Sequence, residues 1–168
     1  LLDPYFQRAV VLIAENNEKG TVGFVLNNPL DLKVQDLITD FPEFKSPVYL
    51  GGPVEAQNLF FIHNKPQLIP GSMHIKDSIY WNGDFEILKS LIRKKLIQEN
   101  DLRFFLGYSG WDKNQLKEEL NSNSWFITSI QEKHVFRLNS IDLWKEIMSQ
   151  SKREIALMAN FPQDPSLN

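Results

Sequence analysis

The chain contains no cysteine among its 168 residues. Disulfides, thiolate zinc sites and cysteine nucleophiles are therefore excluded. Because small secreted domains usually depend on disulfides, a cytoplasmic location is the simpler expectation. The sequence also lacks an apolar run near the ~20 residues that a membrane-spanning helix needs, and it shows no signal-peptide pattern. We therefore expect a cytoplasmic protein with no membrane partner.

A surplus of positive charge is missing as well. Lys and Arg number 18 against 21 Asp and Glu, which gives a net charge of −3. Proteins that bind nucleic acid through its phosphates usually carry a basic surface, so the overall charge does not support DNA as a partner. The basic run Arg93-Lys94-Lys95 points in different directions around a predicted helix and makes a poor track for phosphates.

Recognisable cofactor and metal motifs are also lacking. The chain has three histidines, His63, His74 and His134, and no tight pair among them. No P-loop and no glycine-rich dinucleotide motif is present. We therefore expect no metal and no cofactor.

Apolar side chains, by contrast, are plentiful. Hydrophobic residues make up 42% of the chain and aromatic residues 12%. This composition predicts a packed core rather than disorder, and the length suits one domain over residues 1–168.

Short apolar runs and helical spacings together predict the elements. Strands are expected over residues 8–14, 21–26, 48–50, 59–63, 79–81, 102–108, 125–128 and 135–138. Helices are expected over residues 34–41, 84–98, 113–121 and 141–148. Loops are expected over residues 15–20 and 65–74. Three of the helices have candidate caps: Asn82 or Asp84, Asp112 with Gln115 as a capping box, and Asn139 or Ser140. Strands and helices mix without a regular βαβ order, which favours an α+β fold with a mixed or largely antiparallel sheet.

The segment Gly107-Tyr108-Ser109-Gly110-Trp111 invites comparison with a nucleophile elbow. It lies between a predicted strand and a predicted helix, so we interpret it as a tight aromatic turn. The elbow needs small residues two positions before and after the serine, because its turn is strained and crowded. Trp111 stands at the second of these positions, which disfavours Ser109 as a nucleophile.

Two further segments have both a structural and a chemical interpretation. Gly51-Gly52-Pro53 could present backbone N–H groups to an anion, but Pro53 removes one donor, which favours a structural turn. His63 ends an apolar strand, where it is either a general base or a buried, hydrogen-bonded histidine.

Taken together, these segments resemble the AlgH/YqgE family of bacterial proteins. The resemblance rests on residues 3–12, 20–29 and 51–54, on His63, and on the GYSGW segment with Gln115, Leu116, Glu119, Leu120 and Trp125. It implies an α+β domain with a bifurcated, partly barrel-like sheet flanked by helices. Family members commonly have Arg where this chain has Asn28. They also usually have a strand before the Asp-Pro pair, so we expect a natural N-terminus that begins earlier than Leu1.

The leading functional hypothesis is a non-enzymatic domain that binds a small molecule or a protein partner. Its candidate binding surface is formed by the signature residues Asn27, Gly51, Gly52, Pro53, His63, Gly107, Tyr108, Gly110, Trp111 and Gln115. One alternative is an enzyme of unknown class that uses His63 with Asn27 or a nearby carboxylate. Another is transcriptional regulation, which rests only on the label that the family carries.

Overall fold

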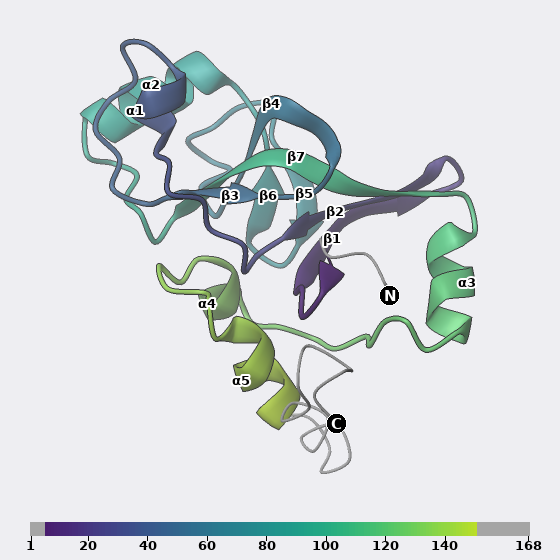
Figure 1. Ribbon diagram of the computed structural model, residues 1–168. Helices are drawn as coiled ribbons and strands as arrows, with labels where there is room; N and C mark the ends of the chain where they lie inside the picture. Colours follow the sequence, from purple (N-terminus) through teal and green to yellow (C-terminus); the bar gives the residue numbers. More distant parts are fainter. Residues whose placement is uncertain (1–5, 151–168) are drawn as a thin grey trace.

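A seven-stranded sheet organises the part of the chain that the computed structural model describes, residues 6–150 (Figure 1). Its strands are β1 (Val11–Asn17), β2 (Gly20–Val25), β3 (Val48–Leu50), β4 (Val54–His63), β5 (Met73–Lys76), β6 (Ile79–Trp81) and β7 (Leu102–Asp112). The helices are α1 (Val34–Leu37), α2 (Phe85–Arg93), α3 (Gln115–Asn121), α4 (Glu132–Val135) and α5 (Leu143–Gln150). The strand order is β1-β2-β7-β4-β6-β5, and β3 pairs separately with β7.

Strand β7 belongs to both halves of the sheet. Its first half, through Leu106, pairs in parallel with β3 and antiparallel with β4. Its second half, Ser109 to Asp112, pairs antiparallel with β2. In Figure 1, β7 crosses the molecule from the β3–β6 half to the β1–β2 hairpin, and α3 follows at its far end. The sheet is therefore bifurcated along one strand, and β3–β7 is its parallel pair within the described residues.

Three glycines make the bifurcation possible, because backbones meet there without room for side chains. A Cβ atom on Gly51 would lie 2.4 Å from the carbonyl oxygen of Gly107, and one on Gly52 would lie 2.3 Å from the carbonyl carbon of Tyr108. Gly107 itself has a left-handed backbone, with φ 66°, which favours glycine. We call Gly51, Gly52 and Gly107 the glycine crossing.

Hydrogen bonds tie three chain segments together at this crossing. The N–H of Gly51 donates to the carbonyl of Leu106 over 2.9 Å. The carbonyl of Gly51 accepts from the Val25 N–H, at the end of β2, over 3.0 Å. It also accepts from the buried Ser109 hydroxyl over 3.0 Å. The end of β2, the chain after β3 and the middle of β7 are thus joined within a few residues.

The core has two parts, because successive side chains of a strand point to opposite faces. Phe104 belongs to one cluster with residues of α1 and α2, such as Val34 and Leu88. Its neighbour Phe105 belongs to a second cluster with residues of α4 and α5, including Leu143. Figure 1 shows the matching arrangement, with α1 and α2 together on one side of the sheet and α4 and α5 on another.

A buried arginine attaches the C-terminal helices to the sheet. Arg103, on β7, is only 2% exposed, and its guanidinium lies 4.3 Å from the centre of the Tyr49 ring. It donates to the carbonyl of Leu26 over 2.9 Å and also to the carbonyl of Arg137. Burial lowers the pKa of Arg103 to about 10, so the group stays charged at neutral pH. The Tyr49 hydroxyl donates to the Leu138 carbonyl nearby.

The predicted α+β class and the largely antiparallel, bifurcated sheet are confirmed. Strands β3, β4, β6 and β7 include the ranges predicted for them, and β4 and β7 are longer than expected. Strand β2 is shifted by one residue from the predicted range 21–26. The hairpin turn is shorter than predicted, since β1 runs on to Asn17 and pairs it with Gly20. Asp84 is the cap of α2, because its carboxylate accepts from the Ile87 N–H over 2.9 Å.

Several predictions are wrong. The GYSGW segment is not a turn, because Ser109 to Asp112 form a ladder with β2 and continue the strand. No strand forms over residues 125–128 or 135–138, and Val135 is the last residue of helix α4. Residues Met73 and His74 belong to β5 rather than to a loop, since β6 supplies a partner strand. Asp112 does not cap α3. It ends β7, and the helix begins at Gln115.

Within residues 6–150, no helix has both the length and the apolar character needed to cross a membrane. The expectation of an earlier N-terminal strand concerns residues outside the described range.

The glycine crossing makes a direct prediction about stability. Gly51→Ala adds a methyl group 2.4 Å from a backbone oxygen that cannot move without breaking the ladder. We expect the free energy of unfolding to fall by about 3 kcal/mol or more, measured by urea unfolding with tryptophan fluorescence. Gly110→Ala is the control, because its nearest neighbour is the flexible end of Tyr108 at 3.3 Å. Equal losses in the two variants would contradict this account.

Candidate functional site

The structure distributes the ten predicted surface residues over several places instead of one pocket. Gly51, Gly52 and Gly107 pack backbone to backbone at the glycine crossing, where Tyr108 lies beside them. Gly110 and Trp111 lie further along β7, and Trp111 contacts α3. The surface has two hollows among the described residues, and Asn27 is the member of the set that lines one of them. Pro53 is exposed at the start of β4.

His63 is a structural histidine in this fold. Its side chain is 0% exposed, and both ring nitrogens are engaged with the backbone. Nδ1 accepts from the Lys65 N–H over 3.1 Å, so Nε2 carries the proton and donates to the Asn82 carbonyl over 3.0 Å. Burial lowers the pKa of His63 below 6.5, and the bond to Asn82 only partly offsets this. The neutral ring therefore joins β4 to the loop before α2 and does not reach solvent.

Ser109 is likewise engaged. It is 0% exposed in the second half of β7, and its hydroxyl donates to the Gly51 carbonyl. A serine in regular strand, bonded to backbone and closed to solvent, cannot attack a substrate. The disfavoured nucleophile hypothesis is excluded by this geometry.

A carboxylate that the sequence analysis named only among the family motif residues joins four side chains into one polar cluster. One oxygen of Glu119, on α3, accepts from the indole N–H groups of Trp111 at 3.0 Å and Trp125 at 2.6 Å. The other oxygen accepts from the Gln115 amide over 3.1 Å. The two indoles meet edge to face with centroids 5.7 Å apart, and Phe6 packs on both. We call Trp111, Gln115, Glu119 and Trp125 the tryptophan clamp.

The clamp gives these four residues one shared structural role. Partial burial raises the pKa of Glu119, but the hydrogen bonds from Trp125, Trp111 and Gln115 outweigh it, and the pKa lies below 4.5. The carboxylate is thus held ionised while it fastens α3 and the segment after it to the end of β7. The sequence did contain a signal for this cluster. The indole N–H of a buried or half-buried tryptophan usually has a hydrogen-bond acceptor, and Glu119 lies between Trp111 and Trp125 in the sequence.

Of the capping box predicted from Asp112 and Gln115, only the hydrogen bond made by the Gln115 side chain is present. Its side-chain oxygen accepts from the Asp112 N–H over 3.0 Å, which is the return bond of a capping box. The N-cap position of α3 is Asn114, whose left-handed backbone turns the chain from strand to helix. Gln115 thus bonds both to the end of β7 and to Glu119.

The first hollow lies between the N-terminal segment and α5, and we call it the α5 groove. It has a volume of about 370 Å³ and is lined by Gln7, Arg8, Ala9, Val25, Asn27, Asn28, Ile141, Asp142, Trp144 and Lys145. Asn27 builds its wall: the side-chain oxygen accepts from the Val10 N–H and the amide donates to the Arg8 carbonyl, both over 2.8 Å. The Arg8 guanidinium lies 5.1 Å from the centre of the Trp144 ring.

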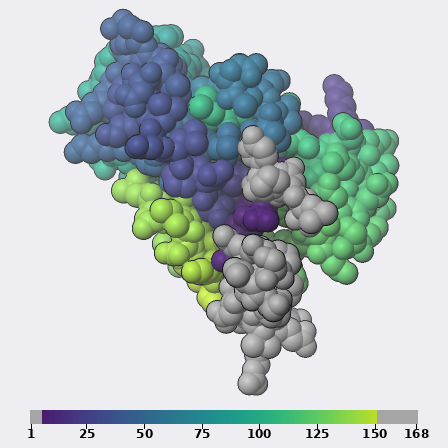
Figure 2. All heavy atoms as spheres, in the orientation of Figure 1, coloured from purple at the N-terminus to yellow at the C-terminus, as the bar shows by residue number. Residues whose placement is uncertain are grey.

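The surface view places this region between two projections. Figure 2 shows the yellow-green α4–α5 surface and the green surface of α3 and the segment after it on either side of purple N-terminal residues. The α5 groove carries two cationic side chains, Arg8 and Lys145, against one carboxylate, Asp142.

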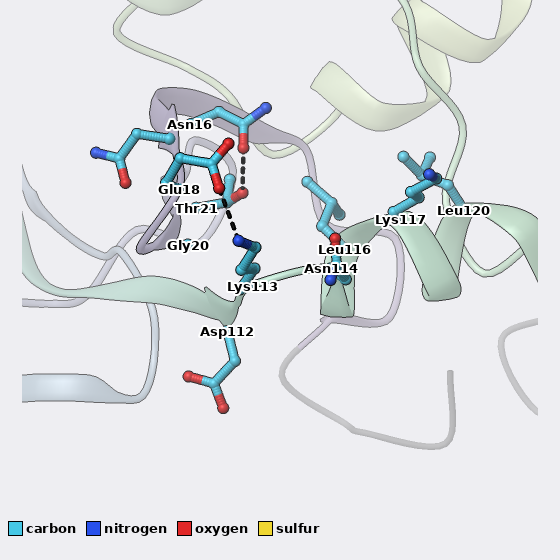
Figure 3. Close-up of a pocket in the computed structure, with 11 residues that line it drawn as sticks. Asn16, Glu18, Gly20, Thr21, Asp112, Lys113, Asn114, Leu116, Lys117 and Leu120 are labelled. Atoms are coloured by element: carbon cyan, nitrogen blue, oxygen red, sulfur yellow. Dashed lines mark hydrogen bonds and ion pairs between the residues drawn. The ribbon is translucent and has the colours of Figure 1, made fainter.

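The second hollow, of about 350 Å³, lies between the β1–β2 hairpin and α3 (Figure 3). Two pairs of its polar side chains bond to each other. The Thr21 hydroxyl donates to Asn16 over 2.8 Å, and Lys113 pairs with Glu18 over 2.7 Å. Within residues 6–150, no cluster of three or more His, Asp or Glu side chains is arranged to hold a metal ion.

Comparison with known proteins identifies relatives for almost the whole chain. The sequence model of the AlgH-like family matches residues 1–156. The chain belongs to the AlgH-like family. The resemblance drawn from the sequence motifs is thereby confirmed.

Relatives within this family carry the name UPF0301 protein. One from Cytophaga hutchinsonii is 38% identical over 167 residues, covering 99% of this chain and 92% of the relative. One from Parabacteroides distasonis is 40% identical over 170 residues, covering 100% and 86%.

Two solved structures share the fold of this AlgH-like chain. Protein DIP2367 from Corynebacterium diphtheriae has a TM-score of 0.78 at 22% identity, over 96% of this chain and 86% of that one. The AlgH protein from Pseudomonas aeruginosa has a TM-score of 0.73 at 23% identity, over 96% and 88%.

The buried His63 predicts a pH dependence of stability. Its pKa is lower in the folded chain than the ordinary 6.5, so the unfolded chain takes up the proton first. Stability is therefore complete above pH 6.5 and falls as the pH drops toward the folded pKa. Urea unfolding from about pH 7.5 to about pH 5.5 should show this fall.

The matched variants are His63→Gln and His74→Gln. His63→Gln lowers stability at neutral pH by about 1–3 kcal/mol, since buried backbone groups lose partners, and weakens the pH dependence. The exposed His74 is the control. A pH dependence that survives in the His63 variant and disappears in the His74 variant would refute the assignment.

The tryptophan clamp predicts an acid-sensitive contact. Because the folded pKa of Glu119 lies below 4.5, its stabilisation is complete above that value and is lost as the pH falls through the folded pKa. Glu119→Gln should remove this contribution and change the tryptophan fluorescence at neutral pH. Glu118→Gln, on the adjacent exposed residue of the same helix, is the control. Identical spectra and acid transitions in both variants would contradict the clamp.

Proposed function

We propose that this chain is a non-catalytic binding domain whose α5 groove takes a small anionic molecule. The observation that carries the proposal is that Arg8 and Lys145 both line a hollow of about 370 Å³ whose wall is fixed by Asn27. That volume falls at the lower end of the range found for small-molecule sites.

The charges around the groove support an anion over a cation. Two cationic side chains face one carboxylate, although the chain as a whole carries a net charge of −3. The positive groups are therefore concentrated locally against the overall sign, and they favour carboxylate or phosphate groups. Trp144 offers an apolar surface beside them.

The two side chains that the sequence offered for catalysis support a binding role. His63 and Ser109 are each 0% exposed and bonded to backbone. Each is used by the fold at a point where strands or loops join. The groove residues other than the buried Val25 are, in contrast, exposed or half-buried on the surface.

A ligand panel tests the proposal. The purified chain is screened by thermal shift against di- and tricarboxylates, inorganic phosphate and nucleoside phosphates, and positive compounds are measured by calorimetry at two salt concentrations. We expect saturable, salt-sensitive binding that Lys145→Glu weakens by about tenfold or more, because an attractive charge becomes repulsive.

Lys94→Glu is the matched control, since it places the same charge change on an exposed residue at the end of α2. Binding that responds equally to both variants would locate the ligand elsewhere. A panel without any binder would contradict the proposed function.

A further inference from the structure

The chain contains one Asn-Gly pair, Asn82-Gly83, in the turn between β6 and α2. An asparagine before a glycine is especially prone to deamidation, because glycine has no side chain to hinder attack by its backbone nitrogen. Both residues have a positive φ, 52° for Asn82 and 124° for Gly83. The turn itself requires the glycine, since a Cβ atom at Gly83 would lie 2.6 Å from a side-chain carbon of Ile69.

Deamidation of this pair needs only the chain and water. The Gly83 nitrogen attacks the side-chain carbonyl carbon of Asn82 and loses its proton, and the side-chain amide takes up a proton and leaves as ammonia. Water then opens the succinimide ring at either carbonyl, which gives an aspartate or an isoaspartate at position 82. In the isoaspartate, the main chain runs through the former side chain and the original backbone carbonyl becomes a free carboxylate.

The attacking and leaving groups of the pair are not used by the fold. Within the described residues, the Gly83 N–H donates to no acceptor, and the side-chain amide N–H groups of Asn82 donate to none. Both residues are half-buried, so the turn also borders solvent. Neither a bonded nucleophile nor exclusion from solvent therefore protects the pair.

Contacts with β4 restrain the pair instead. The Asn82 N–H donates to the Phe61 carbonyl over 2.8 Å, and the Asn82 side-chain oxygen accepts from the Phe61 N–H over 3.3 Å. The backbone carbonyl of Asn82 accepts from the buried His63 ring over 3.0 Å. Ring closure requires the side chain and the following peptide plane to rotate toward each other. The bonds to Phe61 and His63 fix both of these groups on β4.

We propose that Asn82-Gly83 is a deamidation site that the contacts with Phe61 and His63 keep closed, and that it reacts when the end of β6 separates from β4. The isoaspartate product cannot restore the turn, because the main chain is longer and the carbonyl that His63 binds is displaced. Deamidation therefore marks chains that have opened at this point. The proposal uses none of the residues of the α5 groove and does not depend on the proposed function.

Peptide mapping by mass spectrometry, combined with an enzymatic assay for isoaspartate, tests the proposal in mildly alkaline buffer. The samples are the native chain, the chain unfolded in urea and a synthetic peptide of residues 78–88. We expect the native chain to form the products at Asn82 at least about tenfold more slowly than either unfolded sample, because only the open fraction reacts.

His63→Gln and His74→Gln are the matched variants for the role of the ring. The loss of the His63 contact should make opening more frequent and speed product formation at Asn82 by about threefold or more. His74 is exposed on β5 and lies opposite Tyr80 of β6. The same substitution there should leave the rate at Asn82 unchanged.

A further measurement does not require a variant that folds. The unaltered chain is incubated at urea concentrations below its unfolding transition, and the rate at Asn82 is followed. We expect a gradual rise before global unfolding, because local opening exposes surface and is favoured by urea.

A slow native reaction, a selective increase in the His63 variant and a gradual rise in urea support the proposal. Equal rates at Asn82 in the native and unfolded chains would show that the site is not closed. No product at Asn82 in the unfolded chain would remove the site itself. A rate that stays flat until global unfolding, or that rises equally in both histidine variants, would contradict the restraint by β4.

Discussion

The close backbone contact between Gly51, Gly52 and Gly107 is the constraint on which the rest of this fold depends. It lets β7 leave the β3–β4 half of the sheet and continue beside β2 without a break. Any side chain at Gly51 or Gly52 would meet backbone atoms within 2.4 Å. The bifurcated sheet therefore exists because glycine stands at both sides of one crossing.

Several residues of the motifs that suggested the family have structural roles in this fold. His63 fastens β4 to the loop before α2, Ser109 bonds to Gly51, and the tryptophan clamp fastens α3 to the end of β7. The His63 ring, the Ser109 hydroxyl and the Glu119 carboxylate are groups that often act in catalysis. In this fold each of them is hydrogen-bonded to another part of the chain. The proposed binding function is instead assigned to the α5 groove, where the motif residue Asn27 lines a surface hollow.

Elements with local signals could be predicted from the sequence, and those set by distant partners could not. The spacing of Leu88, Leu91 and Ile92 predicted α2 because helical periodicity is local. The path of Ser109 to Asp112 depends on β2, more than 80 residues earlier, so GYSGW was read as a turn. Arg103 gave no signal at all, since its partners are backbone carbonyls and a ring supplied by distant segments. Of the candidate surface, the sequence located Asn27 but not Arg8, Trp144 or Lys145, which α5 brings beside it.

Native-state hydrogen exchange is the most direct test of the crossing as the central constraint. The amides of Val25 and Gly51, which bond across the crossing, should exchange only through global unfolding, with free energies equal to that of the whole chain. Amides in the β1–β2 and β3–β4 halves should then become unprotected together. If the two halves open independently while Val25 and Gly51 exchange through a small local opening, the sheet does not depend on the glycine crossing and the account fails.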